Sequence, residues 1–313
     1  MILRGIDFGN VFTASGTLNF FGQGWPFHKI YQFIPGFDFT DSTFTAKTVT
    51  FAPRQGNMPL DRNLQPKELM PKCIKVYFRK GIILNAVGLS NPGIHALLKT
   101  GQWQKRTKPF FISFMPARNT VNDRLDEMEK FVVVLKNALP DFKTEIGLEI
   151  NISCPSDIIT ATKDLLKIAS ALHIPLILKI NALASATLIK KSADSGLCDA
   201  LSISNTIPWG ELPDKIDWQK LFKTATSPLA EYGKDGLSGW PLLQITADKI
   251  REFRKAGINI PIIAGGGILC QKDIIVLKKA GSNAVAIASA AILRPWRIKK
   301  IINSANQFFK EVP

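Results

Sequence analysis

The 313 residues are 46% hydrophobic with a mean hydropathy of +0.08, which excludes a disordered chain, and no apolar run reaches the roughly 18 residues of a membrane span. Lys and Arg outnumber Asp and Glu by 40 to 25, but this net charge of +15 is scattered and matches no nucleic-acid motif, so we expect neither nucleic-acid nor membrane binding. The four cysteines form no CxxC pair and the three histidines have no metal-ligand spacing, which excludes a disulfide framework and a metal site and favours the cytoplasm.

The rest of the pattern is a repeated alternation of short apolar runs and longer amphipathic stretches. Apolar runs predict eight strands, at residues 44–50, 81–85, 110–114, 146–151, 176–180, 200–204, 260–264 and 284–288. Helical periodicity predicts helices at residues 122–138, 158–172, 184–195, 246–256 and 272–280. Apolar strands alternating with helices are typical of a parallel sheet buried on both faces. We therefore expect an α/β fold, a (β/α)8 TIM barrel that forms one domain over residues 1–313.

Two stretches interrupt this alternation. Residues 1–40 precede the first predicted strand, and we expect them to form a short N-terminal cap. Residues 205–244 follow the sixth strand and contain many prolines and glycines. Long irregular connections in a compact domain are commonly functional. We expect an active-site insertion at the C-terminal face of the barrel, where (β/α)8 enzymes place their chemistry.

Glycines follow the seventh predicted strand. Gly265, Gly266 and Gly267 come directly after it, and Ser289 comes after the eighth strand. Glycine lets backbone N–H groups approach an anion, and barrels often bind phosphate after these two strands. The alternative is a tight turn that binds nothing. The pattern favours a phosphate group without identifying the enzyme.

A cysteine follows the fourth predicted strand. Cys154 comes after Asn151 and Ser153, so its thiol is expected in the loop layer rather than in the core. A thiolate in such a place can act as a general base. The alternative is a small buried hydrophobe, which is our interpretation of the other three cysteines, Cys73, Cys198 and Cys270.

Lysines and asparagines lie at or near the ends of other strands. Lys47 and Lys179 each interrupt an apolar strand, so each must point into the barrel mouth or have a charged partner, unless it reaches solvent. Asn85, Asn151 and Asn205 offer donors and acceptors that suit a planar ring with alternating C=O and N–H groups, although each alone could be a turn residue. Together they predict a polar site with a basic floor.

Eight short segments of the chain, taken in order, resemble the motifs of a known protein family. They are Ala14-Ser-Gly16, Lys47 with Arg54-Gln-Gly-Asn57, Asn85-Ala-Val-Gly-Leu-Ser-Asn91, Asn151-Ile-Ser-Cys-Pro155, Lys179, Ser204-Asn-Thr206, Gly236-Leu-Ser-Gly239 and Gly265-Gly-Gly-Ile268. In this order, over about residues 1–295, they resemble the dihydroorotate dehydrogenase family. Cys154 resembles the base of its soluble type, because membrane-bound members carry serine there.

The resemblance implies FMN as cofactor and dihydroorotate as substrate, with Cys154 and Lys47 as catalytic residues. Cys154 would take the proton from C5 while hydride passes from C6 to flavin N5. The implied substrate-binding residues are Lys47, Asn85, Gly88, Leu89, Asn151, Asn205 and Thr206. The implied cofactor-binding residues are Ala14, Ser15, Gly16, Lys47, Thr48, Asn85, Asn151, Lys179, Thr206, Gly239, Gly265, Gly266, Gly267, Ala288 and Ser289.

Partners and substrate stay open in part. The resemblance is compatible with a homodimer and with an iron–sulfur electron-transfer subunit, and the electron acceptor could be fumarate, NAD through such a subunit, or another oxidant. Ser156 stands where the family usually has asparagine, so another pyrimidine or cyclic amide is an alternative substrate. A different class of function is a basic barrel without catalysis that binds nucleic acid or an acidic partner.

Overall fold

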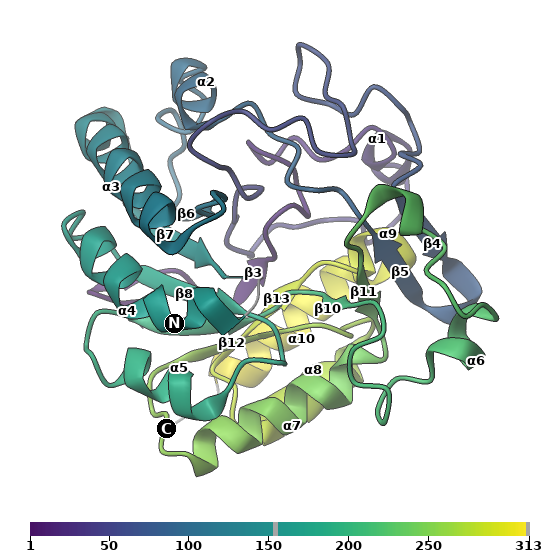
Figure 1. The fold of residues 1–313 in the computed structure, drawn as a ribbon. Helices are drawn as coiled ribbons and strands as arrows, with labels where there is room; N and C mark the ends of the chain where they lie inside the picture. The colour runs from purple at the N-terminus through teal and green to yellow at the C-terminus, as the bar shows by residue number, and fades with distance from the viewer. Residues whose placement is uncertain (153–155, 311–313) are drawn as a thin grey trace.

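The computed structural model describes residues 1–152 and 156–310, with the side chains of residues 156–160 left aside. Its centre is a seven-stranded parallel sheet that curls into most of a barrel (Figure 1). In spatial order the strands are β3 (Val11–Thr13), β13 (Ala284–Ile287), β12 (Ile262–Gly265), β9 (Ala200–Ile203), β8 (Leu176–Ile180), β7 (Ile146–Asn151) and β6 (Phe110–Phe114). Every pair of neighbours in this sheet is parallel.

Residues 43–49 join the two edges of the curled sheet. Thr43 donates its backbone N–H to Val11 O of β3 at 2.7 Å, and the N–H groups of Ala46 and Val49 donate to Phe111 O and Ser113 O of β6 at 2.8 and 2.9 Å. These contacts are parallel bridges in register with both strands. The segment therefore takes the eighth strand position, and the predicted (β/α)8 barrel is confirmed.

The prediction of a barrel strand at residues 81–85 is wrong. Instead, β5 (Ile82–Asn85) pairs antiparallel with β4 (Ile74–Tyr77) and with β11 (Gly236–Gly239). The missing barrel strand is β3, which lies inside the segment expected to be only a cap. An apolar run is buried in either kind of sheet, so hydrophobicity alone does not distinguish the two.

Residues 205–244 fold back over the barrel instead of forming a structureless loop. β10 (Ile207–Pro208) and β11 complete a four-stranded antiparallel sheet, in the order β10-β11-β5-β4, and α6 (Trp218–Phe222) lies between them in sequence. Because β11 pairs with β5 along its whole length, the insertion is held by a second segment far away in sequence.

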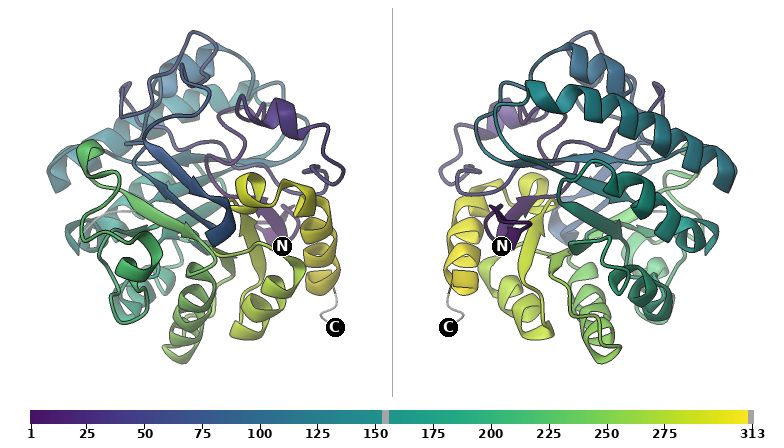
Figure 2. Two further views of the ribbon diagram at one scale, coloured as in Figure 1. Left: turned by 90° about the vertical axis from the view of Figure 1, so that its right-hand side faces the viewer. Right: turned by 90° about the vertical axis from the view of Figure 1, so that its left-hand side faces the viewer.

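Helices cover the outside of the parallel sheet (Figure 2). The longer ones are α3 (Val121–Ala138), α4 (Ser156–Ser170), α5 (Ala186–Ala193), α7 (Leu242–Lys255), α8 (Gln271–Ala280) and α10 (Ile298–Lys310). Shorter ones are α1 (His28–Tyr31), α2 (Ile94–Lys99) and α9 (Ala290–Leu293). α3 is typical, because Thr120 caps its start by accepting from Asp123 N, and its inner face buries Met128, Phe131 and Leu135. No helix in the described ranges is long and apolar enough to cross a membrane.

A hairpin seals one end of the barrel. β1 (Ile2–Leu3) and β2 (Ile6–Asp7) pair antiparallel, and the buried Leu3 and Phe8 pack with side chains from the first residues of the barrel strands, among them Phe111 and Ile177. The centroid of the Phe8 ring lies 4.4 Å from that of Phe111. This end of the barrel is therefore filled by apolar side chains, whereas Asn151 and Lys179, which were predicted for the site, lie at the other ends of β7 and β8.

Candidate active site

In β6 and β8, the inward-facing side chains change from apolar to polar along the strand. In β6 and β8, the residues two positions after Phe111 and Ile177 are Ser113 and Lys179, which face the same interior because side chains alternate with a period of two. Gly147 begins the same inward row of β7, and a Cβ atom there would collide with the Phe111 ring. Ser113 and Lys179 therefore belong to a polar layer inside the barrel, next to a tightly packed apolar layer that contains Phe111 and Ile177.

Lys179 has a charged partner in this layer. Its Nζ lies 3.4 Å from Oε1 of Glu149 on the adjacent strand β7, and the two side chains are only 5% and 6% exposed. Burial removes both charges from water, and the pair compensates this only through close mutual attraction. Glu149 Oε1 is buried and accepts no hydrogen bond from any residue that the structure describes, so the ion pair with Lys179 compensates its charge. The structure thus places one buried cation beside one buried anion.

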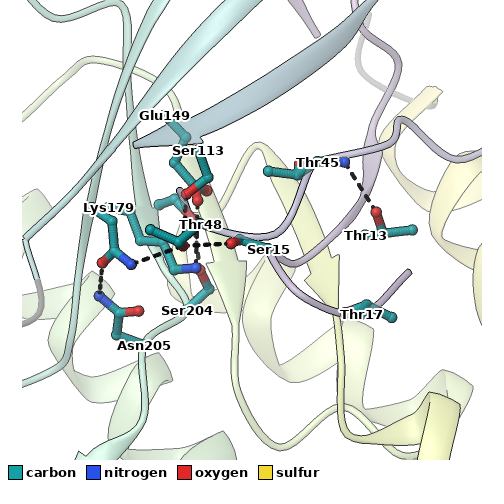
Figure 3. A network of polar contacts seen from close by, with 12 residues as sticks. Thr13, Ser15, Thr17, Thr45, Thr48, Ser113, Glu149, Lys179, Ser204 and Asn205 are labelled. Carbon is teal, nitrogen blue, oxygen red and sulfur yellow. Dashed lines mark hydrogen bonds and ion pairs between the residues drawn. The ribbon is translucent and has the colours of Figure 1, made fainter. Parts of the chain in front are cut away.

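A chain of hydroxyl and amide groups crosses the polar layer (Figure 3). Thr48 Oγ1 lies 2.7 Å from Ser15 Oγ and 3.0 Å from Ser113 Oγ, and it accepts a hydrogen bond from Asn151 Nδ2 at 3.1 Å. Asn151 Oδ1 in turn accepts from Asn205 Nδ2 at 2.8 Å. Four of the residues predicted for the site, from four different segments, are therefore brought together with Ser113.

Lys47 lies nearby but in a different environment. Its Nζ donates to Ser90 O and lies 5.0 Å from the centroid of the Phe20 ring, and its side chain is buried. Burial lowers the pKa of Lys47 to about 7, although the nearby Cys73 raises it in part. A neutral carbonyl is a weaker partner than a carboxylate, so this ammonium can lose its proton near neutral pH.

The loop after β5 lies next to Lys47, whose Nζ donates to Ser90 O of this loop. Gly88 and Leu89 both have a positive φ, of 69° and 60°, which is unusual for leucine. Asn57 holds this loop to the insertion, because its Nδ2 donates to Ala86 O at 2.7 Å and to Tyr232 O at 2.8 Å. Asn85 is tied in the same way, with Nδ2 3.3 Å from Gly236 O. The insertion therefore supports this loop directly.

The glycines after β12 are required by close packing. Gly266 has a φ of +97°, and a Cβ on it would lie 3.1 Å from both Leu242 Cβ and Thr246 Oγ1 at the start of α7. A Cβ on Gly267 would collide with the backbone of Leu243. Thr246 Oγ1 also donates to Gly265 O at 3.0 Å. The close packing against α7 is therefore a structural reason for Gly266 and Gly267, whatever the turn binds.

Other predicted residues lie around this turn and the strand ends. Ala288 follows β13 and is exposed, whereas Ser289 beside it is buried at the start of α9. Gly239 ends β11, with a φ of +113°, and a Cβ there would collide with Gly81 O. Thr206 packs against Gly236, where a Cβ would collide with its hydroxyl. Gly239 thus lies in the antiparallel sheet, whereas Thr206 lies on the short connection between the parallel strand β9 and β10.

Two findings adjust the predicted residue set. Glu149 was missed, although its signal is the same as that of Lys179, a charged residue that interrupts an apolar strand. Cys154 lies outside the described residues. No three His, Cys, Asp or Glu side chains gather as a metal site would require within the described part of the chain.

Comparison with known proteins identifies the family. The family model for dihydroorotate dehydrogenase matches residues 2–309. The chain belongs to the dihydroorotate dehydrogenase family. One relative in this family, from Thermoanaerobacter pseudethanolicus, is 28% identical over 95% of this chain and 89% of its own length. Another, from Bacillus mycoides, is 30% identical over 74% of this chain and 73% of its own length. Both are named dihydroorotate dehydrogenase B (NAD(+)), catalytic subunit.

A solved structure supports the fold. DHODH from Eimeria tenella in complex with ferulenol superposes with a TM-score of 0.66, over 98% of this chain and 84% of that chain. The sequence identity is 20%, so this likeness bears on the fold alone. The dihydroorotate dehydrogenase family is flavin-dependent in general, which agrees with a polar barrel mouth that contains two buried lysines.

Proposed function

We propose that the protein is an FMN-dependent oxidoreductase that oxidises dihydroorotate to orotate in pyrimidine biosynthesis. The observation that carries this proposal is the match of the dihydroorotate dehydrogenase family to residues 2–309. The site agrees with it, because Lys47, Lys179 and the chain of amides from Asn151 to Asn205 lie at one open end of the barrel.

The residues present fit FMN. Gly266 and Gly267 adopt a turn in which a Cβ would not fit, and the exposed Ala288 directly follows the adjacent strand β13. The backbone N–H groups of this turn, Gly265 and Ser289 are therefore our candidates to hold the phosphate. Lys179 would face the N1–O2 edge, where negative charge develops on reduction. When bound, FMN supplies a hydride acceptor. The proposed remaining contacts are Ala14, Ser15, Gly16, Lys47, Thr48, Asn85, Asn151, Thr206 and Gly239.

The substrate carboxylate is proposed to bind at Lys47. Its ammonium and the backbone N–H groups of Gly88 and Leu89 suit a carboxylate better than a neutral group. Asn85, Asn151, Asn205 and Thr206 would then read the pyrimidine ring. Asn205 uses its amide N–H on Asn151, which leaves its carbonyl oxygen for a ring N–H.

Cys154 is proposed as the base that takes the C5 proton. The thiol of this residue follows β7 in sequence, three positions after Asn151. Lys47 would act with it by holding the carboxylate, so that C5 and C6 keep a fixed orientation.

Assembly and location are proposed from the relatives. Their name includes "catalytic subunit", which supports an electron-transfer subunit as partner, with an iron–sulfur centre as its redox group. We also propose a homodimer, a cytoplasmic location, and one domain over residues 1–313 with residues 205–244 as the active-site insertion. Residues 1–40 act as a cap only in part, since β3 within them is a barrel strand.

An absorbance spectrum of the purified protein tests the proposal. We expect flavin bands that bleach when dihydroorotate is added without oxygen, and Cys154→Ala should keep the bands but bleach slower by roughly 100-fold or more. A colourless protein that takes up no added FMN would contradict the cofactor. Flavin that bleaches with another cyclic amide but not with dihydroorotate would contradict the substrate.

A further inference from the structure

A hollow lies on the outside of the barrel, where the first turns of α8 and α10 meet. The two helices pack side by side (Figure 1), and the hollow between their ends has a volume of about 410 Å³. It is lined by Cys270, Gln271, Lys272, Trp296, Arg297 and Lys300. None of these belongs to the proposed flavin or substrate site. The volume is in the range of small-molecule sites, roughly 300–1,000 Å³.

Positive charge gathers at this hollow without a counter-ion. Lys272 and Lys300 are exposed and make no hydrogen bond or ion pair with any described residue, and Arg297 donates only to Leu269 O, at 3.4 Å. The nearby Asp273 does not line the hollow, because its carboxylate accepts from the backbone N–H groups at the start of α8. Three cations around one concavity repel each other, and a bound polyanion relieves that repulsion.

Trp296 lines the hollow with a flat aromatic ring whose position is restrained by neighbouring residues. The side chain is 47% exposed, and the guanidinium carbon of Arg294 lies 5.9 Å from its ring centroid. Its backbone is fixed, since Lys299 N donates to Gly36 O at 2.9 Å and a Cβ on Gly36 would collide with Trp296 O. A half-exposed indole on a fixed backbone is a stacking surface for a planar ring.

We propose that this hollow binds a nucleotide with two or more phosphates. The base stacks on Trp296, and the phosphates are held by Lys272, Arg297 and Lys300. Three cations match a diphosphate or triphosphate better than a single carboxylate, because each phosphate oxygen accepts charge-assisted hydrogen bonds. A hollow lined by only six residues favours a single nucleotide over an extended nucleic-acid strand, which needs a continuous basic groove.

Calorimetric titration of the purified full chain tests this proposal. The probes are UTP, ATP and sodium pyrophosphate, each at physiological salt. We expect at least one nucleotide to bind roughly 10-fold more tightly than pyrophosphate, since stacking on an aromatic ring contributes about that much. Trp296→Ala should reduce nucleotide affinity to that of pyrophosphate. The double variant Lys272→Glu with Lys300→Glu should weaken it by about 100-fold.

A matched control separates the hollow from the overall charge. Lys279→Glu with Lys310→Glu changes the net charge equally on exposed residues of the same two helices, away from the hollow, and should weaken binding less than about threefold. Absence of binding, equal binding of pyrophosphate, or an equal effect of the control would overturn the proposal. So would tighter binding of an RNA 10-mer that does not depend on Trp296. The flavin spectrum is measured separately, so the outcome does not depend on the proposed dehydrogenase activity.

Discussion

The two buried lysines at the barrel mouth, Lys179 and Lys47, lie in regions that differ in whether a negatively charged partner is present. On the side of β7 and β8, Lys179 lies 3.4 Å from the carboxylate of Glu149. On the side of residues 43–58 and 86–91, Lys47 contacts the neutral carbonyl of Ser90 and the Phe20 ring, and burial lowers its pKa to about 7. The same residue type is thus a compensated charge in one region and an uncompensated one in the other.

The difference follows from how each region is built. Glu149 and Lys179 lie on adjacent parallel strands, and both side chains face inward, so regular alternation brings them together. Lys47 lies on the irregular segment that closes the barrel, opposite a loop, and a loop offers it backbone carbonyls. We infer that the Lys179–Glu149 ion pair on the strand side stays charged whether or not a ligand is bound. On the loop side, the protonation of Lys47 can change when a ligand binds.

The largest expected effect is on the strand side. Lys179→Ala leaves Glu149 buried without a counter-ion, and the free energy of unfolding should fall by about 3–5 kcal/mol. Urea denaturation of the flavin-free protein measures this. The double variant Lys179→Met with Glu149→Leu should recover most of the loss. A single variant as stable as the original chain would show that the pair is not a buried ion pair.

The next effect concerns the contact between the two regions. Thr48→Val removes the acceptor of Asn151 and the partner of Ser15 and Ser113, and it should lower the free energy of unfolding by roughly 1–3 kcal/mol. Thr48→Ser keeps the hydroxyl and serves as control. If Thr48→Val is as stable as the original chain, the hydroxyl does not stabilise the fold, and any loss in Thr48→Ser would be due to the missing methyl group.

A smaller effect is expected from pH on the loop side. Because the pKa of Lys47 is lowered to about 7, the free protein loses the cationic form as pH rises above 7. A bound carboxylate favours that form, so orotate affinity should fall with rising pH, at most about tenfold per pH unit. Lys47→Arg stays charged, and its orotate affinity should not change between pH 7 and 9. A flat profile for the original chain would contradict the role of Lys47.

The same pKa shift also predicts how stability depends on pH. The unfolded state holds the proton of Lys47 up to about pH 10.5, whereas the folded state releases it near 7. The unfolded state therefore binds more protons within this window, and this contribution to stability rises with pH there. Lys47→Met should remove that rise, as urea denaturation at pH 7 and 9 would show.

The smallest expected effect lies at the glycine turn. Thr246→Val removes the hydrogen bond to Gly265 O and should weaken FMN binding by only a few-fold, equivalent to about 1 kcal/mol. Fluorescence titration with FMN measures this. Gly266→Val is the matched severe variant, because its side chain meets Leu242 and its φ of +97° disfavours valine. Normal FMN binding by Gly266→Val would place the phosphate elsewhere.

The sequence predicts the barrel well where strands are buried and regular. β6, β7, β8 and β13 lie within a residue of their predicted positions, because short, largely apolar runs are typical of buried parallel strands. β3 could not be recognised, since three residues are too short for a periodic signal. β5 was assigned to the wrong sheet, because its partner β11 lies some 150 positions away and no local pattern reveals that pairing.

The candidate site could be predicted by residue type but not by partner. Strand ends indicate Lys179, Asn151 and Asn205 because polar side chains in apolar strands must be satisfied. The sequence does not reveal that Asn151 bonds Asn205, or that Thr48 joins three segments, since these contacts depend on how the barrel closes. The ion pair of Lys179 could have been predicted, because Glu149 is likewise a charged residue inside an otherwise largely apolar strand.

Residues 43–49 have a consequence for how the protein matures. This short stretch completes the ring through backbone contacts to β3 and β6, and it also carries Lys47 and Thr48. Because the proposed FMN site includes both residues, we expect that a chain with all its helices formed but with residues 43–49 unpaired does not hold FMN. Mild heating should therefore release bound FMN, measured as a loss of protein-bound flavin absorbance, before the helical circular dichroism declines. Added FMN should bind only to molecules in which residues 43–49 pair with β3 and β6.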